Sequence, residues 1–190
     1  MEADLLLWIH RQATPALDAA FRFSWALGVL RFCAPAILLV IGWHLARQER
    51  REALAWLVVG VGAAVLPELV KAVVARPRPT LWPWLLPTSG YSFPSGHAVA
   101  GAALYPLLGW LALCSRGRGL VGYLLGLALG VFIGLGRLYA GVHWPSDVLA
   151  GWALGAALSL GAIRWLGASP PTSALTAPAA SSRVDGLGSR

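Results

Sequence analysis

A histidine and an aspartate stand four residues apart in the second half of the chain. His143 and Asp147 flank Pro145, a residue type favoured in the first turn of a helix. At a helix start, this spacing lets the carboxylate reach one ring nitrogen of the histidine and orient the other nitrogen toward a substrate. The pair therefore has the chemistry of a nucleophile with its orienting acid, and His97, from a different segment, is left to protonate a leaving oxygen.

The segment Pro94-Ser95-Gly96-His97 stands immediately before a long apolar run. A small, flexible turn at a helix start presents free backbone N–H groups and the positive end of the helix dipole, which suit an anion such as phosphate. Ser95 adds a hydroxyl donor, and Gly96 lets the backbone approach a ligand closely. This segment predicts an anion site at the beginning of a helix.

Three cations are expected to share that anion site. Lys71 is the single lysine among the 15 Lys and Arg residues of the chain, and Arg78 and Arg137 stand in the two neighbouring polar segments. Arginine matches phosphate oxygens in a bidentate manner, whereas lysine acts as a mobile point charge. Fixed donors of this kind stabilise the charge that develops during phosphoryl transfer. We therefore expect these cations to bind phosphate together with Ser95 and Gly96.

Each of these features also has a structural explanation when it is taken alone. A His-x-x-x-Asp spacing is common, and Arg76 and Arg78 can be ordinary anchors at a membrane surface. Glu68 can simply pair with Lys71, which follows it by three residues. His44 is not accompanied by a similar group of polar residues in the sequence and is expected to be structural. The joint occurrence of the features in one order favours catalysis over these separate explanations.

The composition places these residues in a membrane protein. The chain has 190 residues, of which 57% are hydrophobic and only 12% are charged, compared with roughly 25% charged residues in an ordinary soluble domain. The 10 Trp residues include many near the ends of apolar runs, as at a membrane–water interface. The net charge of +7 comes from scattered charges and not from a basic run, so we expect no nucleic-acid partner.

Five apolar stretches are long enough to span a bilayer, which takes about 20 residues. Residues 1–28 before them are predicted to form one or two short amphipathic helices at the interface, with a sixth span there as the alternative. Residues 168–190 are rich in Ala, Ser, Pro and Gly and are predicted to be a disordered tail. The expected fold is thus an all-α polytopic membrane bundle whose transmembrane domain occupies residues 29–167. The predicted spans are Val29–Ala46, Ala53–Ala75, Ala98–Cys114, Gly119–Gly136 and Val148–Leu166.

Five spans place the candidate residues on one face of the membrane. The connections 76–97 and 137–147 share a side with the N-terminus, while 47–52 and 115–118 lie on the other side. Charged groups near a membrane core are costly and are usually functional. The sequence contains neither His-Glu-x-x-His nor an acidic cluster suited to Mg²⁺, and the cations would repel a divalent ion. We therefore expect chemistry that needs no metal or other cofactor.

Taken in order, these segments resemble the three motifs of the type 2 phosphatidic acid phosphatase family. The resemblance spans Lys71 to Asp147, and the apolar segments on either side extend it. Gly136 departs from the family pattern, which has Ser there, and the extra N-terminal span of many bacterial members is not evident. The matching residues are Lys71 with six residues to Arg78-Pro79, then Pro94-Ser95-Gly96-His97, then Arg137 with five residues to His143 and three more to Asp147.

The resemblance implies a membrane-embedded lipid phosphatase that needs no metal. In it, His143 is the nucleophile that forms a phosphohistidine, Asp147 orients it, and His97 is the general acid. The other matching side chains and the Gly96 amide hold the phosphate. The run Ser89–His97 is most similar to that of bacterial enzymes acting on lipids such as undecaprenyl pyrophosphate or phosphatidylglycerophosphate. Such enzymes lie in the bacterial cytoplasmic membrane, with the active site facing the periplasm or the outside.

Two other functions fit the same residues. A lipid phosphotransferase would use the same phosphohistidine and pass the phosphate to an acceptor other than water. A non-catalytic membrane protein that binds anions or lipids would explain Lys71, Arg78 and Arg137 but would leave the histidines without a purpose. The sequence does not fix the lipid headgroup or tail, or the oligomeric state.

Overall fold

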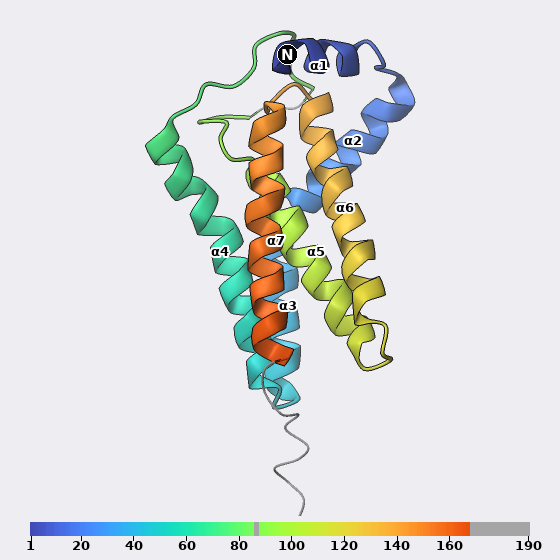
Figure 1. Cartoon of the computed structure of the whole chain (residues 1–190), viewed down its shortest axis with the longest axis vertical. Coiled ribbons are helices and arrows are strands. Elements are labelled where there is room, and N and C mark those ends of the chain that lie inside the picture. Colours follow the sequence, from blue (N-terminus) through green and yellow to red (C-terminus); the bar gives the residue numbers. More distant parts are fainter. Residues whose placement is uncertain (86–87, 168–190) are drawn as a thin grey trace, which may run out of the picture.

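The computed structural model describes residues 1–85 and 88–167, and the expected disordered tail lies outside these described residues. The described residues fold into helices joined by turns and loops, and they contain no strand. The expected all-α fold is therefore confirmed (Figure 1). The helices are α1 (Glu2–His10), α2 (Pro15–Gly28), α3 (Leu30–Ala46), α4 (Arg50–Val74), α5 (Gly96–Cys114), α6 (Gly119–Tyr139) and α7 (Pro145–Gly167).

Four of the described helices, α4 to α7, are long and apolar enough to cross a membrane on their own. Helices α2 and α3 form a bent pair that passes the same test together, which brings the total to as many as five spans. Large apolar side chains point outward from the bundle, as with Leu39 and Val73, which are 76% and 85% exposed. Outward-facing apolar side chains suit contact with lipid, and the protein is an integral membrane protein.

The break between α2 and α3 has an identifiable cause. Val29 adopts an extended conformation, so the helical hydrogen-bond ladder stops there. The carbonyl oxygen of Leu27, in the last turn before the break, accepts a hydrogen bond from Tyr105 Oη at 2.8 Å and one from Cys33 Sγ at 3.1 Å. Polar backbone groups in a membrane must find hydrogen-bond partners within the protein. These two side chains supply such partners for the carbonyl that the break leaves without a helical one. The predicted span Val29–Ala46 thus corresponds to α3, the second helix of this bent pair.

Different loops and turns between the helices lie at the two ends of the bundle. Figure 1 shows α1 lying across the end at which α6 finishes and α7 begins, and the loop between α4 and α5 reaches the same end. The turns between α3 and α4 and between α5 and α6 lie at the opposite end. This is the grouping of segments that five spans predict, with the candidate residues gathered beside the N-terminus.

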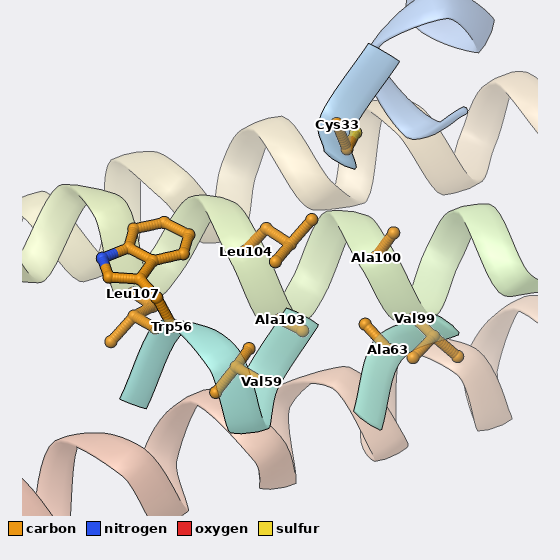
Figure 2. Close-up of a cluster of buried hydrophobic side chains, with 9 residues drawn as sticks. All are labelled: Cys33, Trp56, Val59, Ala63, Val99, Ala100, Ala103, Leu104 and Leu107. Atoms are coloured by element: carbon orange, nitrogen blue, oxygen red, sulfur yellow. The ribbon is translucent and has the colours of Figure 1, made fainter. Parts of the chain in front are cut away.

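Helix α5 is the centre of the bundle, and close packing holds it in place. On one side it meets α6 through glycines, and a Cβ atom on Gly130 would overlap the backbone of Gly101. Small residues at such crossings let helix backbones approach closely in a membrane. On its other side, α5 packs against Trp56, Val59 and Ala63 of α4, as Figure 2 shows. This packing sets the direction of α4, whose last turns carry Lys71, relative to α5, whose first turn carries His97.

Candidate active site

His143 lies in the turn between α6 and α7 and is only 2% exposed. Its Nδ1 is 2.8 Å from the carbonyl oxygen of Ser92, and its Nε2 is 3.1 Å from Nη1 of Arg78. A carbonyl oxygen only accepts a hydrogen bond, and an arginine N–H only donates one. The hydrogen-bond network therefore assigns the proton to Nδ1 and leaves Nε2 unprotonated, with its lone pair accepting a hydrogen bond from Arg78. Nε2 can act as a base or nucleophile once a substrate takes the place of that hydrogen bond.

Asp147 sits behind His143 and is completely buried. Its Oδ2 is 3.5 Å from Nδ1 of His143 and accepts a hydrogen bond from the Trp144 amide at 2.8 Å, which caps the start of α7. The carboxylate thus lies beside the imidazole, as its spacing predicts. However, the nearest acceptor for Nδ1 is the Ser92 carbonyl, so two groups share the orienting task that the sequence gives to Asp147 alone.

The environment of His143 keeps its imidazole neutral. Burial lowers the pKa of His143 to about 4, and the positive charges of Arg137 and Arg78 act in the same direction, whereas Asp147 opposes them. A nucleophilic nitrogen needs its lone pair, so the neutral form is the reactive one. At neutral pH the turn therefore presents an unprotonated Nε2.

A cavity of about 470 Å³ opens in front of this histidine. Six of the eight residues predicted for the site line it, and they come from α4, α5, α6 and the connections between the helices. Ser95 and Asp147 are fully buried and are not among its lining residues. The structure thus brings the predicted residues together around one cavity. The six lining residues are Lys71, Arg78, Gly96, His97, Arg137 and His143.

Several buried polar atoms at the site have no hydrogen-bond partner among the described residues. They are Ser95 Oγ, His97 Nε2 and Arg137 Nε. Unpartnered buried polar atoms are rare in proteins because each one costs desolvation free energy. A ligand with several acceptor oxygens, such as phosphate, would supply partners for donors placed beside this cavity.

Arg78 is held in place by backbone carbonyls. Its Nε donates to Gly90 O at 3.0 Å, and its Nη2 donates to Ser89 O at 2.9 Å. Its Nη1 donates to Val142 O at 2.8 Å and also faces Nε2 of His143. The guanidinium is therefore fixed where it can contact both the histidine and an oxyanion bound in the cavity.

Lys71 reaches the cavity from the last turns of α4. Its ammonium donates to Glu68 Oε1 at 2.6 Å, so the pairing expected between these residues is present. Glu68 itself lines the cavity. Within the described ranges, no three His, Cys, Asp or Glu side chains are placed to hold a metal ion together.

Two glycines explain how α2 approaches the site. A Cβ atom on Gly28 would lie 2.7 Å from Cδ2 of His97, so the end of α2 packs directly against this ring. A Cβ atom on Gly136 would overlap the hydroxyl of Ser24, also on α2. Gly136 is not among the residues that line the cavity. The glycine that replaces the usual serine therefore accommodates Ser24 and does not remove a hydroxyl from the cavity.

Sequence reasoning missed the roles of Ser92 and Arg76. Ser92 contributes a backbone carbonyl, which leaves no signal in side-chain patterns. Arg76 was not among the residues expected at the site, and an anchor at the membrane surface was one explanation for it, yet its Nη1 donates to Oδ1 of Asp147 at 2.7 Å. Its position two residues before Arg78 is the only signal that could have found it.

The sequence is similar to those of two curated phosphatases. The chain is 31% identical to phosphatidylglycerophosphatase B of Bacillus subtilis (strain 168) over 134 residues, which are 68% of this chain and 65% of that protein. It is 34% identical to an undecaprenyl-diphosphatase of Sulfolobus acidocaldarius, over 60% of this chain and 54% of the relative. The matched region thus spans less than two thirds of the length of both relatives.

The fold is similar to that of a solved structure. The crystal structure of a transmembrane PAP2 type phosphatidylglycerolphosphate phosphatase from Bacillus subtilis superposes with a TM-score of 0.80 at 26% identity, covering 90% of this chain and 87% of that one. Residues 52–170 match the PAP2 superfamily, and this segment contains all the residues proposed for the site. The chain therefore belongs to the PAP2 superfamily.

Proposed function

We propose that the protein is a phosphatase that removes a phosphate group from a membrane lipid through a phosphohistidine on His143. The observation that carries this proposal is that the neutral imidazole of His143 shares one cavity with three cationic side chains, and that Nε2 of His97 and Nε of Arg137 have no partner there. Lys71, Arg78 and Arg137 supply positive charge, and Ser95 and the Gly96 amide supply further donors. Because cations face the cavity, we expect the reaction to need no metal.

The first half of the proposed reaction forms the phosphoenzyme. Nε2 of His143 attacks the phosphorus atom, and the bond between phosphorus and the lipid oxygen breaks. His97 donates a proton to that oxygen as it leaves. The proton on Nδ1 of His143 faces the Ser92 carbonyl and the Asp147 carboxylate, which stabilise the positive charge that develops on the ring.

The second half of the reaction releases phosphate. A water molecule gives a proton to His97 and attacks the phosphorus, and the bond between phosphorus and Nε2 breaks. The histidine lone pair and the protonated state of His97 are thereby restored. The cationic groups stabilise the charge on the transferring phosphoryl group in both halves.

A lipid substrate is supported by a second, apolar cavity beside the first. It has a volume of about 190 Å³ and lies among α2, α3, α4 and α5. Cys33, Ile37 and Leu104 line both cavities, so the two adjoin each other. A phosphate headgroup can thus occupy the cationic cavity while the first part of its tail lies in the apolar one.

The relatives suggest which lipids to test. Their names refer to phosphatidylglycerophosphate and to undecaprenyl diphosphate. We propose that one of these headgroup classes is the substrate. We further propose that the protein lies in the bacterial cytoplasmic membrane, with the end carrying His143 facing the periplasm or the outside.

Phosphate release by the detergent-purified protein tests this function. Both candidate lipids are offered in the presence of EDTA, with the His143→Ala variant alongside. We expect release from at least one lipid, insensitivity to EDTA, and loss of release in the variant. Full activity of His143→Ala would refute the mechanism, and transfer of labelled phosphate to a second lipid would indicate a phosphotransferase instead.

A further inference from the structure

Helix α1 is docked on the protein at the end that carries the site. Figure 1 shows it lying across the beginning of α7 and the end of α6. Leu6 is 0% exposed and packs with Ala98, Leu138 and Val148, which belong to α5, α6 and α7. The ring of His10 also stacks on Trp82 with a centroid distance of 4.3 Å. These contacts hold α1 against the segments that build the site.

Glu2, in the first turn of α1, uses both of its carboxylate oxygens. Oε1 accepts a hydrogen bond from the amide of Ser146 at 2.9 Å, in the first turn of α7. Oε2 accepts one from Nη2 of Arg76 at 2.7 Å. A carboxylate beside a helix N-terminus is favoured by the helix dipole. Glu2 thus ties α1 to the beginning of α7 and to Arg76 at the same time.

Arg76 connects Glu2 to Asp147. Its Nη1 donates to Oδ1 of Asp147 at 2.7 Å and to Oγ of Ser146 at 2.6 Å. Its Cζ lies 5.3 Å from the centre of the Trp144 ring. One guanidinium therefore joins an acid of the N-terminal helix to the buried acid behind the nucleophilic histidine.

The position of Arg76 separates its role from phosphate binding. Lys71, Arg78 and Arg137 line the cavity, whereas Arg76 does not. Its guanidinium donors are directed to Glu2, Ser146 and Asp147. The positive charge of Arg76 therefore faces the Asp147 carboxylate and is directed away from the cavity.

We propose that Glu2 and Arg76 are positioning residues for the nucleophile, and that α1 is thereby part of the catalytic apparatus. Glu2 fixes the plane of the Arg76 guanidinium, Arg76 fixes Oδ1 of Asp147, and this leaves Oδ2 facing Nδ1 of His143. If Arg76 lost its contact with Glu2, its guanidinium would no longer be held in one orientation. The Asp147 carboxylate would then turn toward its remaining partners, and the imidazole of His143 would lose its orientation. This inference rests on the proposed role of His143.

Kinetics of the Glu2→Gln variant test this proposal, with Asp4→Asn as the matched control. Asp4 lies on the same helix, and its side chain is 82% exposed, so its variant removes the same charge without touching Arg76. We expect Glu2→Gln to lower kcat by about tenfold while KM changes less than about twofold, as for loss of a partner that orients a reacting group. Asp4→Asn should match the wild type. A Glu2→Asp variant should recover part of the lost kcat.

A double-mutant cycle with Asp147→Asn separates positioning from simple stabilisation. If Glu2 acts through Asp147, Glu2→Gln should cause almost no further loss of kcat in the Asp147→Asn background. An equal fold loss in both backgrounds, or a rise in KM at unchanged kcat, would overturn the proposal. Thermal unfolding of each variant in detergent confirms that the compared proteins are folded.

The same experiment distinguishes failure of this inference from failure of the proposed function. His143→Ala is measured beside the other variants. If it is inactive while Glu2→Gln equals the wild type, only the connection through Arg76 is overturned. If His143→Ala is fully active, the proposed function fails and the positioning proposal fails with it.

Discussion

His143 and His44 are two buried histidines at opposite ends of the bundle, and each has a carboxylate beside it. Nδ1 of His44, near the end of α3, is 2.8 Å from Oε2 of Glu49. Nδ1 of His143 is 3.5 Å from Oδ2 of Asp147. Burial and an adjacent acid are therefore common to both histidines and do not by themselves mark a reactive one.

The two histidines differ in where their partners come from. Glu49 follows His44 by five residues and also accepts from Nε of the nearby Arg47 at 3.0 Å, so this cluster is made within one turn. His143 is contacted by Ser92 and Arg78, which lie 51 and 65 residues away in the sequence. The whole fold is thus used to assemble the surroundings of His143.

Cavity volume does not distinguish the end of the bundle with His143 from the end with His44 either. The cavity beside His44 has a volume of about 530 Å³, compared with about 470 Å³ at the site. Its charged lining groups are Arg47, Glu49 and Glu52, a mixture of both signs. The site cavity instead carries an excess of cations and adjoins several unpartnered donors. An excess of cationic side chains, and not a hollow, distinguishes the end that carries His143.

The largest expected effect comes from exchanging each histidine for glutamine, which is similar in size. His143→Gln should reduce phosphate release by on the order of 10⁴-fold or more, because it removes the nucleophile. His44→Gln should retain activity within about threefold, since it alters only a local hydrogen bond to Glu49, far from the site. Initial rates of phosphate release measure both. Comparable losses of phosphate release in the two variants would contradict the different roles given to His143 and His44.

A smaller effect is expected when one arginine at each end is exchanged. Arg137→Gln should weaken inhibition by vanadate, a phosphate analogue, by about 10–100-fold, which corresponds to loss of a charge-assisted hydrogen bond. Arg47, whose side chain is 57% exposed, is the matched control, and Arg47→Gln should leave the inhibition constant unchanged. An unaltered inhibition constant for Arg137→Gln would mean that this buried cation does not face the anion.

The smallest effect concerns the pH dependence of stability. The pKa of His143 is lowered to about 4 in the folded protein. Between about pH 6.5 and pH 4, His143 is therefore protonated in the unfolded chain but not in the folded protein. Lowering the pH from 7 to 5 should therefore cost the wild type about 1–2 kcal/mol of stability that His143→Gln does not lose. Thermal unfolding in detergent at several pH values measures this difference. A constant difference between the two proteins would show that His143 keeps an ordinary pKa.

The sequence predicts which side chains gather at the cavity, because polar residues stand out in an apolar chain. Lys71, Arg78, Arg137 and His97 each occur at the end of a membrane span, and each one is found at the cavity. Charged groups are expensive at such positions, so their presence carries information. The all-α fold is predictable for the same reason, from long apolar stretches.

The supporting contacts are not predictable in this way. The Ser92 carbonyl belongs to the backbone, and every residue has one, so no residue type indicates its role. Glu2 lies 74 residues from Arg76, and the choice of partner depends on how α1 docks through Leu6. Within Leu5-Leu6-Leu7 all side chains are alike, and only the fold decides that Leu6 is the buried one.

The central claim is that His143 carries the phosphoryl group, and trapping the phosphoenzyme tests it most directly. The protein is mixed with a lipid substrate labelled in the phosphate, quenched in alkaline denaturant within milliseconds, digested and mapped by mass spectrometry. Our account predicts the label on the His143 ring, with none on His44 and none in His143→Ala. Labelled phosphate that is released without ever appearing on His143, or that appears on another residue, would contradict it.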